Sequence, residues 1–277
     1  MELGEKLKSA GVPYNSVIRP VEGRVIVYAA DPVQVSAALG IAGKSSGSAS
    51  RHRDLEVDFV RADERNRGGP DAEGLLRGGA FLGGCTSGFV LRSLGSGAKR
   101  LSTAAHCGYT GDYLRYQNPN QAASTSLKMT WRHFGNEGDI AYLQPNSSFR
   151  PYPSFYAGVS EIRAVRSITS NFYEGRVLCR FGKTTHNECG RLSGDFTSLF
   201  AEYDSKDVGK IAHNLVEMKE RKADRGDSGG PWYAPYQNSA AAGVHSGGAS
   251  CRSTSGVCDH FTPISAFHQF GFEAWKL

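Results

Sequence analysis

One stretch of this 277-residue chain has residue types that could perform covalent catalysis: Arg225-Gly226-Asp227-Ser228-Gly229-Gly230-Pro231. A serine nucleophile needs a sharply turned backbone, so that its Oγ projects outward and nearby N–H groups face the reacting carbonyl. Flanking glycines allow such a turn because they reach backbone angles that other residues avoid. In an acyl transfer, the oxyanion would lie on the N–H groups of Gly226 and Ser228. The same residues are also ordinary turn chemistry, so partners elsewhere must decide.

Two other stretches supply a histidine and an acid. His106 follows the small, strand-compatible residues Leu101-Ser102-Thr103-Ala104-Ala105 and precedes Cys107. Asp139 opens the apolar strand candidate Ile140-Ala141-Tyr142-Leu143. Taken singly, the histidine is typical of a packed loop and the acid of a strand end. Together the three stretches have the order His–Asp–Ser, and a neighbouring imidazole makes a serine hydroxyl competent near neutral pH.

Composition describes the scaffold that must position these residues. The 39% of hydrophobic residues can form a core, and 34 glycines with few amphipathic helix patterns favour an all-β fold rich in tight turns. No apolar run approaches the roughly 18 residues of a membrane span, so no membrane association is expected. The net charge of +5 is spread along the chain and not arranged with aromatics, which argues against nucleic-acid binding.

Cysteine usage indicates an oxidising compartment. No Cys-x-x-Cys pair and no histidines at metal-finger spacing occur, so we expect neither a metal nor a cofactor. An even number of cysteines in a glycine-rich β protein predicts three disulfides, and the simplest pairing joins neighbours in sequence. Any export signal would lie outside this chain, since its first residues lack an apolar segment. The six cysteines are Cys85, Cys107, Cys179, Cys189, Cys251 and Cys258.

The first part of the chain has a different pattern from the rest. Helices are predicted over 2–10 and 33–39, and strands over 25–29 and 55–60, which together make a small α/β unit. Residues 61–74, rich in Arg, Asp, Glu, Gly and Pro, are typical of a linker.

Short strands and turns predominate from about residue 75. Near the end, Ile264, Phe267 and Phe270 recur at helical spacing after Pro263, which predicts a C-terminal helix.

On these motifs, residues 75–277 resemble the chymotrypsin-like serine peptidases, and most closely the bacterial branch of α-lytic protease and the streptogrisins. The resemblance implies two packed six-stranded antiparallel β-barrels with the active site in the cleft between them. It also implies a secreted, monomeric serine endopeptidase that acts on proteins or peptides. The motifs are Cys85-Thr86-Ser87-Gly88-Phe89, Thr103-Ala104-Ala105-His106-Cys107, Asp139-Ile140-Ala141, the segment from Cys179 to Cys189, and Gly226-Asp227-Ser228-Gly229-Gly230-Pro231.

The same resemblance implies a role for each key residue. His106 would be the general base and then the general acid, Asp139 would orient its imidazole, and Ser228 would attack the carbonyl and carry the acyl group. Asp227 is expected to form a structural ion pair with Arg180, which matches an internal arginine of the bacterial branch. Activation would then not require a new N-terminus to insert beside Asp227.

The resemblance also interprets residues 1–74. They would be a pro-region that assists folding and blocks the cleft as an intramolecular inhibitor until it is removed, so the chain would be a zymogen. A separate binding module is the alternative.

The specificity of the enzyme stays open between two interpretations. The residues His245, Ser246, Gly247 and Gly248 match the segment that pairs with the substrate backbone and walls the primary pocket. In glutamate-specific relatives a histidine here binds the substrate side chain, and an imidazole donor suits a carboxylate, which predicts cleavage after Glu or Asp. Alternatively, His245 is a packed strand residue and the pocket accepts medium-sized apolar residues.

Two other classes of function are compatible with this pattern. A catalytically silent homologue could act as a binding protein, but such homologues usually lose a triad residue and none is lost here. An esterase could use the same triad.

Overall fold

The computed structural model describes residues 14–19, 24–29, 50–52, 55–61, 74–121, 123–200, 207, 209–235, 239–252 and 255–277. The chain divides into two compact units, residues 1–67 and 68–277.

The first unit contains a four-stranded sheet with the order β1-β2-β4-β3. Its strands are β1 (Tyr14–Arg19), β2 (Arg24–Ala29), β3 (Ser50–His52) and β4 (Leu55–Arg61). β2 and β4 are parallel, and the other neighbours are antiparallel. The strands expected over 25–29 and 55–60 match β2 and β4, whereas β1 was not expected. The helices expected over 2–10 and 33–39 lie outside the described residues.

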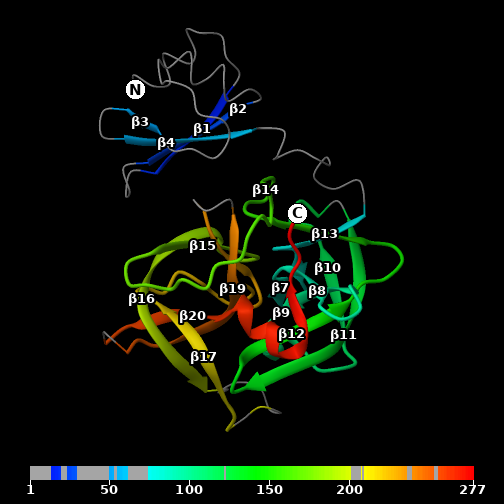
Figure 1. The fold of residues 1–277 in the computed structure, drawn as a ribbon. Coiled ribbons are helices and arrows are strands. Elements are labelled where there is room, and N and C mark those ends of the chain that lie inside the picture. Colours follow the sequence, from blue (N-terminus) through cyan, green and yellow to red (C-terminus); the bar gives the residue numbers. More distant parts are fainter. Residues whose placement is uncertain are drawn as a thin grey trace. The chain divides into compact units, whose positions relative to one another are not determined.

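The first half of the second unit consists of two sheets around one core (Figure 1). Eight strands have the order β21-β8-β9-β12-β11-β10-β6-β7, and three more have the order β14-β13-β5. Leu76 of β5 and Tyr156 of β13 pack in the same cluster as Leu101, Leu127 and Leu143 of the larger sheet. The bounds are β5 (Leu75–Gly78), β6 (Phe81–Leu82), β7 (Cys85–Thr86), β8 (Val90–Ser93), β9 (Lys99–Thr103), β10 (Tyr113–Gln117), β11 (Ser124–Gly135), β12 (Gly138–Gln144), β13 (Arg150–Tyr156), β14 (Ile162–Ala164) and β21 (Phe272–Ala274).

The second half is a closed barrel with the order β15-β16-β17-β20-β19-β18 (Figure 1). All of its neighbouring strands are antiparallel. Its interior includes Leu178, Val216, Trp232 and Phe261. The bounds are β15 (Val177–Gly182), β16 (His186–Phe200), β17 (Ile211–Met218), β18 (Pro231–Ala234), β19 (Ala240–Ser250) and β20 (Val257–Pro263).

The expectation of two six-stranded antiparallel barrels is therefore correct for the second half and wrong in detail for the first. There the ladder is open, because β13 pairs with β5 in parallel and forms a separate sheet. The C-terminal strand β21 also adds to β8 at the other edge, so the larger sheet has eight strands.

The expected C-terminal helix is a 3₁₀ helix, η4 (Ile264–Phe270), and it is followed by β21. A strict three-residue apolar repeat matches 3.0 residues per turn, because side chains at i and i+3 eclipse in a 3₁₀ helix. Gly271 ends the helix in the left-handed region, with a φ of 77°. The sequence pattern thus located the element but not its type.

A third apolar cluster joins the two halves. Phe89 and Ile140 of the first half pack in the same cluster as Tyr233 and Val244 of the second, and Phe267 of η4 lies in it as well. This shared core fixes the two halves against each other.

Three disulfides join cysteines that are neighbours in sequence: Cys85–Cys107, Cys179–Cys189 and Cys251–Cys258. The first connects β7 to the short 3₁₀ helix η3 (Ala105–Cys107), and the second crosses between the paired strands β15 and β16. Among the described residues there is no helix long and apolar enough to cross a membrane.

Candidate active site

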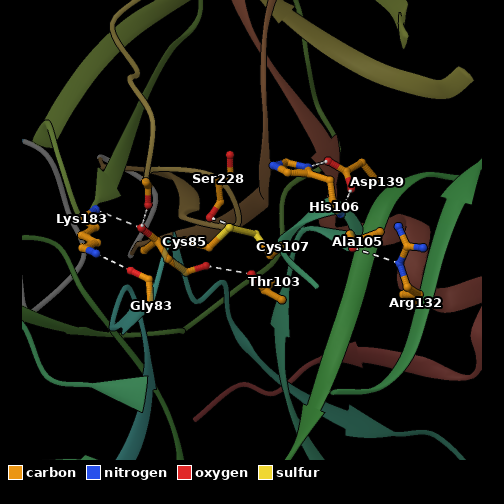
Figure 2. Close-up of a disulfide and its surroundings, with 12 residues drawn as sticks. Gly83, Cys85, Thr103, Ala105, His106, Cys107, Arg132, Asp139, Lys183 and Ser228 are labelled. Carbon is orange, nitrogen blue, oxygen red and sulfur yellow. Dashed lines mark hydrogen bonds and ion pairs between the residues drawn. A yellow bond between two sulfur atoms is a disulfide. The ribbon is translucent and has the colours of Figure 1, made fainter. Parts of the chain in front are cut away.

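His106 lies on η3, three residues after the end of β9. β9 pairs with β12 so that Thr103 is opposite Ala141, which places His106, just past the end of β9, near Asp139 at the start of β12. The disulfide from Cys107 to Cys85 holds the far end of η3 (Figure 2). The imidazole is 30% exposed, so a substrate can reach it.

Asp139 is the partner of His106. Its Oδ2 lies 2.6 Å from His106 Nδ1, and its Oδ1 accepts the backbone N–H of His106 at 3.1 Å. The carboxylate is buried, and Thr262 of β20 accepts the Asp139 N–H at 3.0 Å. A carboxylate can only accept hydrogen bonds, so Nδ1 carries the proton and Nε2 of the neutral ring keeps a lone pair.

Ser228 lies in the turn before β18, within the glycine-rich stretch. Figure 2 shows the His106 ring between Asp139 and Ser228, with its other nitrogen on the Ser228 side. The Ser228 carbonyl accepts the Thr86 N–H at 2.8 Å and lies 3.7 Å from Cys107 Sγ. The serine turn of the second half is thereby hydrogen-bonded to β7 of the first and lies against the disulfide at the end of η3.

The turn requires glycine at position 226. Gly226 has a φ of 101°, and a Cβ there would lie 2.5 Å from Thr184 Oγ1. Within the described residues, the N–H groups of Asp227, Gly229 and Gly230 donate hydrogen bonds, whereas those of Gly226 and Ser228 donate none. Two unpaired donors beside the serine are what an oxyanion site needs.

Asp227 and Arg180 form a buried ion pair beneath this turn. Asp227 Oδ2 lies 3.3 Å from Arg180 Nη1, and both side chains are fully buried. Asp227 also accepts the N–H groups of Thr184, Thr185 and Asp224, together with the Thr185 hydroxyl. Burial lowers the pKa of Arg180, and the charge of Asp227 opposes that shift. The chain therefore contains its own cation for this carboxylate.

The residues His245 to Gly248 belong to β19, which pairs with β18 and β20. Gly229 N–H donates to the His245 carbonyl at 2.7 Å, and His245 N–H donates to the Gly230 carbonyl at 2.9 Å. Ser246 Oγ lies 3.0 Å from Thr262 Oγ1. β19 is thus bonded to the Ser228 turn directly.

His245 is buried, and its ring has a defined tautomer. Trp232 Nε1 donates to His245 Nδ1 at 3.3 Å, which leaves Nε2 as the protonated nitrogen of a neutral ring. Burial lowers the pKa of His245 well below 6.5, and nearby positive groups lower it further. His245 is therefore a neutral donor at neutral pH. The permanently charged groups that disfavour its protonation are Arg180 and Arg221, whereas His106 and His260 contribute only when they are protonated.

Two buried acids close to β19 were missed by sequence reasoning. Asp259, opposite Gly248 on β20, accepts the N–H groups of Lys222 and Ala223, while its Oδ1 has no partner among the described residues. Burial raises its pKa, and those hydrogen bonds oppose the shift. Glu217 Oε2 lies 3.3 Å from His260 Nε2 inside the barrel. Neither acid lies in a local sequence pattern that would have identified it.

The disulfide region also contains the one group of potential metal ligands found among the described residues: Cys85, His106 and Cys107. Its two sulfur atoms are bonded to each other, and His106 Nδ1 is bonded to Asp139. The group therefore offers no thiolate, and it does not suit a metal.

The fold and this arrangement of residues define a serine peptidase of the chymotrypsin-like, double-barrel class. The trypsin family model matches residues 96–270, so the chain belongs to the trypsin family. It is a serine-type endopeptidase, and the resemblance to bacterial chymotrypsin-like enzymes is confirmed. Among curated proteins none matches the chain significantly.

Solved structures similar to this chain include three proteases. The chymotrypsin of Cellulomonas bogoriensis is 24% identical, with a TM-score of 0.55 over 73% of this chain and 98% of that one. Protease A of Thermobifida fusca is 26% identical, with a TM-score of 0.55 over 73% and 100%. A glutamic acid-specific serine protease that uses a histidine triad in substrate binding is 20% identical, with a TM-score of 0.56 over 72% and 100%.

Proposed function

We propose that this endopeptidase hydrolyses peptide bonds with Ser228 as nucleophile, His106 as general base and acid, and Asp139 as the residue that orients His106. The observation that carries the proposal is the 2.6 Å contact between His106 Nδ1 and Asp139 Oδ2, beside a serine on a glycine-flanked turn. It leaves Nε2 as the proton acceptor. The two unpaired N–H groups of Gly226 and Ser228 provide the complementary oxyanion site.

The reaction follows from these positions. His106 Nε2 takes the Ser228 proton as Oγ attacks the carbonyl, and the N–H groups of Gly226 and Ser228 stabilise the oxyanion. The imidazolium, stabilised by Asp139, gives its proton to the leaving amine, and the acyl group remains on Ser228. Water then attacks the acyl group with His106 again as the base. This releases the acid and restores the serine.

Turnover of a peptide substrate by Ser228→Ala and His106→Ala tests the proposal, with Ser96→Ala as the control because Ser96 is an exposed serine in the turn after β8. We expect each active-site change to lower kcat on the order of 10⁶-fold, and the control to change nothing. Undiminished turnover by Ser228→Ala would refute the role of this serine. A catalytically silent homologue would show no turnover in the parent chain either.

We further propose that residues 1–74 are a pro-region and that the protein is secreted as an inactive zymogen. The activated enzyme acts as a monomer. Three disulfides support an oxidising compartment, and the internal pair of Arg180 with Asp227 supports activation by loss of the pro-region alone. Limited proteolysis of the full chain tests this proposal. Activity should appear together with the loss of the N-terminal segment, and full activity of the uncut chain would contradict it.

For specificity, we propose cleavage after Glu or Asp. A neutral His245 with a protonated Nε2 can donate to a substrate carboxylate, and Arg221 adds a positive charge near His245. A glutamic acid-specific protease with a similar fold also uses histidines for substrate binding. A peptide library profiled for the residue before the cut tests the proposal. A preference for Leu or Phe that His245→Ala leaves unchanged would favour the apolar alternative instead.

A further inference from the structure

A second polar group lies behind His106 and takes no part in the steps above. Arg132 on β11 donates from Nε to the Ala105 carbonyl at 3.0 Å (Figure 2). Ala105 is the residue before His106. Arg132 therefore contacts the backbone that carries the proposed catalytic base.

The peptide between Ala105 and His106 is held at both of its polar ends. Its oxygen accepts the Arg132 Nε–H, and its nitrogen donates to Asp139 Oδ1 at 3.1 Å. The His106 ring is bonded to the same Asp139 carboxylate through Nδ1. Asp139 thus sets the ring and one end of the peptide, while Arg132 sets the other end.

Arg132 is itself held by the second half of the unit. Asp207, in the connection between β16 and β17, accepts from both terminal nitrogens of the Arg132 guanidinium. The Asp207 side chain is fully buried and that of Arg132 is 15% exposed, so water competes little for this contact. Lys210 Nζ contacts the same carboxylate at 2.8 Å.

The charge balance of Asp207 agrees with a fixed ion pair. Burial alone would raise its pKa, but the hydrogen bonds and charges of Arg132 and Lys210 outweigh burial and hold the pKa below 3.8. Asp207 therefore stays ionised near neutral pH. The Arg132 guanidinium also lies 5.2 Å from the centre of the Tyr109 ring, which limits its movement on another side.

We infer that Arg132 and Asp207 form a positioning bridge that sets His106 relative to Ser228. His106 belongs to the first half of the unit and Ser228 to the second, so their alignment depends on how the halves are joined. The bridge begins in the second half at Asp207 and ends on the His106 peptide. Arg132 and Asp207 are positioning residues, because they act on His106 through the Ala105–His106 peptide. The inference rests on the proposed function of His106 and Ser228.

Four variants of the full chain, activated by limited proteolysis, test the bridge: Arg132→Gln, Asp207→Asn, Arg132→Lys and the control Arg115→Gln. Arg115 is an exposed arginine on the neighbouring strand β10. Because a displacement of about 1 Å costs on the order of 10²-fold in rate, we expect kcat to fall 10- to 100-fold in Arg132→Gln and Asp207→Asn. KM should stay nearly unchanged, since uniform binding is not altered. The control should match the parent chain.

Arg132→Lys separates positioning from simple stabilisation. Lysine can keep the ion pair with Asp207 but has no Nε–H for the Ala105 carbonyl, so Tm should be preserved while kcat falls. In a Ser228→Ala background, the proton resonance between His106 Nδ1 and Asp139 should shift in the same variants. If Arg132→Gln does not fold, Arg132→Lys and Asp207→Asn decide.

The results distinguish the bridge from the proposed function. Parent-like kcat and an unshifted resonance in folded Arg132→Lys and Asp207→Asn overturn the bridge, provided that Ser228→Ala is inactive. If Ser228→Ala is active, the proposed function itself fails.

Discussion

Breaking the Arg180–Asp227 pair from its two sides should have unequal costs. Asp227→Ala leaves the buried guanidinium of Arg180 with the Thr185 hydroxyl and a long 3.5 Å contact to the Lys222 carbonyl. Its Nε and Nη1 already have no hydrogen-bond partner among the described residues. Removing one partner of a buried ion pair costs about 3–5 kcal/mol, and we expect Asp227→Ala to reach that range.

The reverse change should cost less. In Arg180→Met, the Asp227 carboxylate keeps four donors: the N–H groups of Thr184, Thr185 and Asp224, and the Thr185 hydroxyl. A carboxylate that stays hydrogen-bonded in this way loses the Coulomb attraction but not its partners. We expect a cost of about 1–3 kcal/mol.

Urea unfolding followed by tryptophan fluorescence measures both values. All three tryptophans, Trp131, Trp232 and Trp275, lie in residues 68–277, so the signal reports on the peptidase unit. A Ser228→Ala background prevents self-digestion, and Arg225→Met serves as the control because Arg225 is an exposed arginine of the same turn. An Arg180→Met cost equal to or above that of Asp227→Ala would refute the reasoning, since it would mean that the four donors do not hold the carboxylate.

Three further predictions concern β19 and the serine turn. His245→Gln should lose selectivity for acidic residues in a peptide library. The same change should also make stability less dependent on pH on the acid side. His245 binds a proton near pH 6.5 in the unfolded chain but only at lower pH in the folded chain, because burial lowers its pKa. In the parent chain the unfolding free energy therefore falls as pH drops below about 6.5, by up to about 1.4 kcal/mol per pH unit. An unchanged curve in urea titrations from pH 7 to 4 would contradict this. Asp259→Asn should raise kcat/KM for Glu substrates at neutral pH, because it removes a negative charge opposite Gly248. The Asn oxygen can still accept the N–H groups of Lys222 and Ala223. An unchanged ratio of Glu to Leu cleavage would place Asp259 away from the substrate side chain. Gly226→Ala should lower the free energy of unfolding by about 1–3 kcal/mol and abolish most activity. A residue with a side chain is strained at a φ of 101°, and its Cβ would lie 2.5 Å from Thr184 Oγ1. Parent-like turnover would show that the turn tolerates a side chain.

The sequence was sufficient to predict the fold class, because the motifs around His106, Asp139 and Ser228 each occur in a distinct local pattern. It was not sufficient for the sheet pairings of the first half. The parallel pairing of β13 with β5 and the addition of β21 to β8 join segments far apart in the chain, and no local pattern encodes them. Helical spacing at 264–270 was also ambiguous between two helix types.

The limits at the site have the same origin. Arg180 and His245 could be selected in advance because they lie beside recognisable motifs. Arg132 and Thr262 could not, since Arg132 lies within a long strand and Thr262 lies next to the predicted C-terminal helix, away from every site motif. Their contacts with Ala105 and Asp139 arise only when β11 and β20 are folded against the strands that carry the site.

Covalent labelling of Ser228 by a fluorophosphonate tests the central claim most directly. With the full chain activated by limited proteolysis, mass spectrometry should locate one label at Ser228, and His106→Ala should slow labelling by several orders of magnitude. Labelling of the folded parent chain at another serine, or equally fast labelling without His106, would contradict the proposed triad.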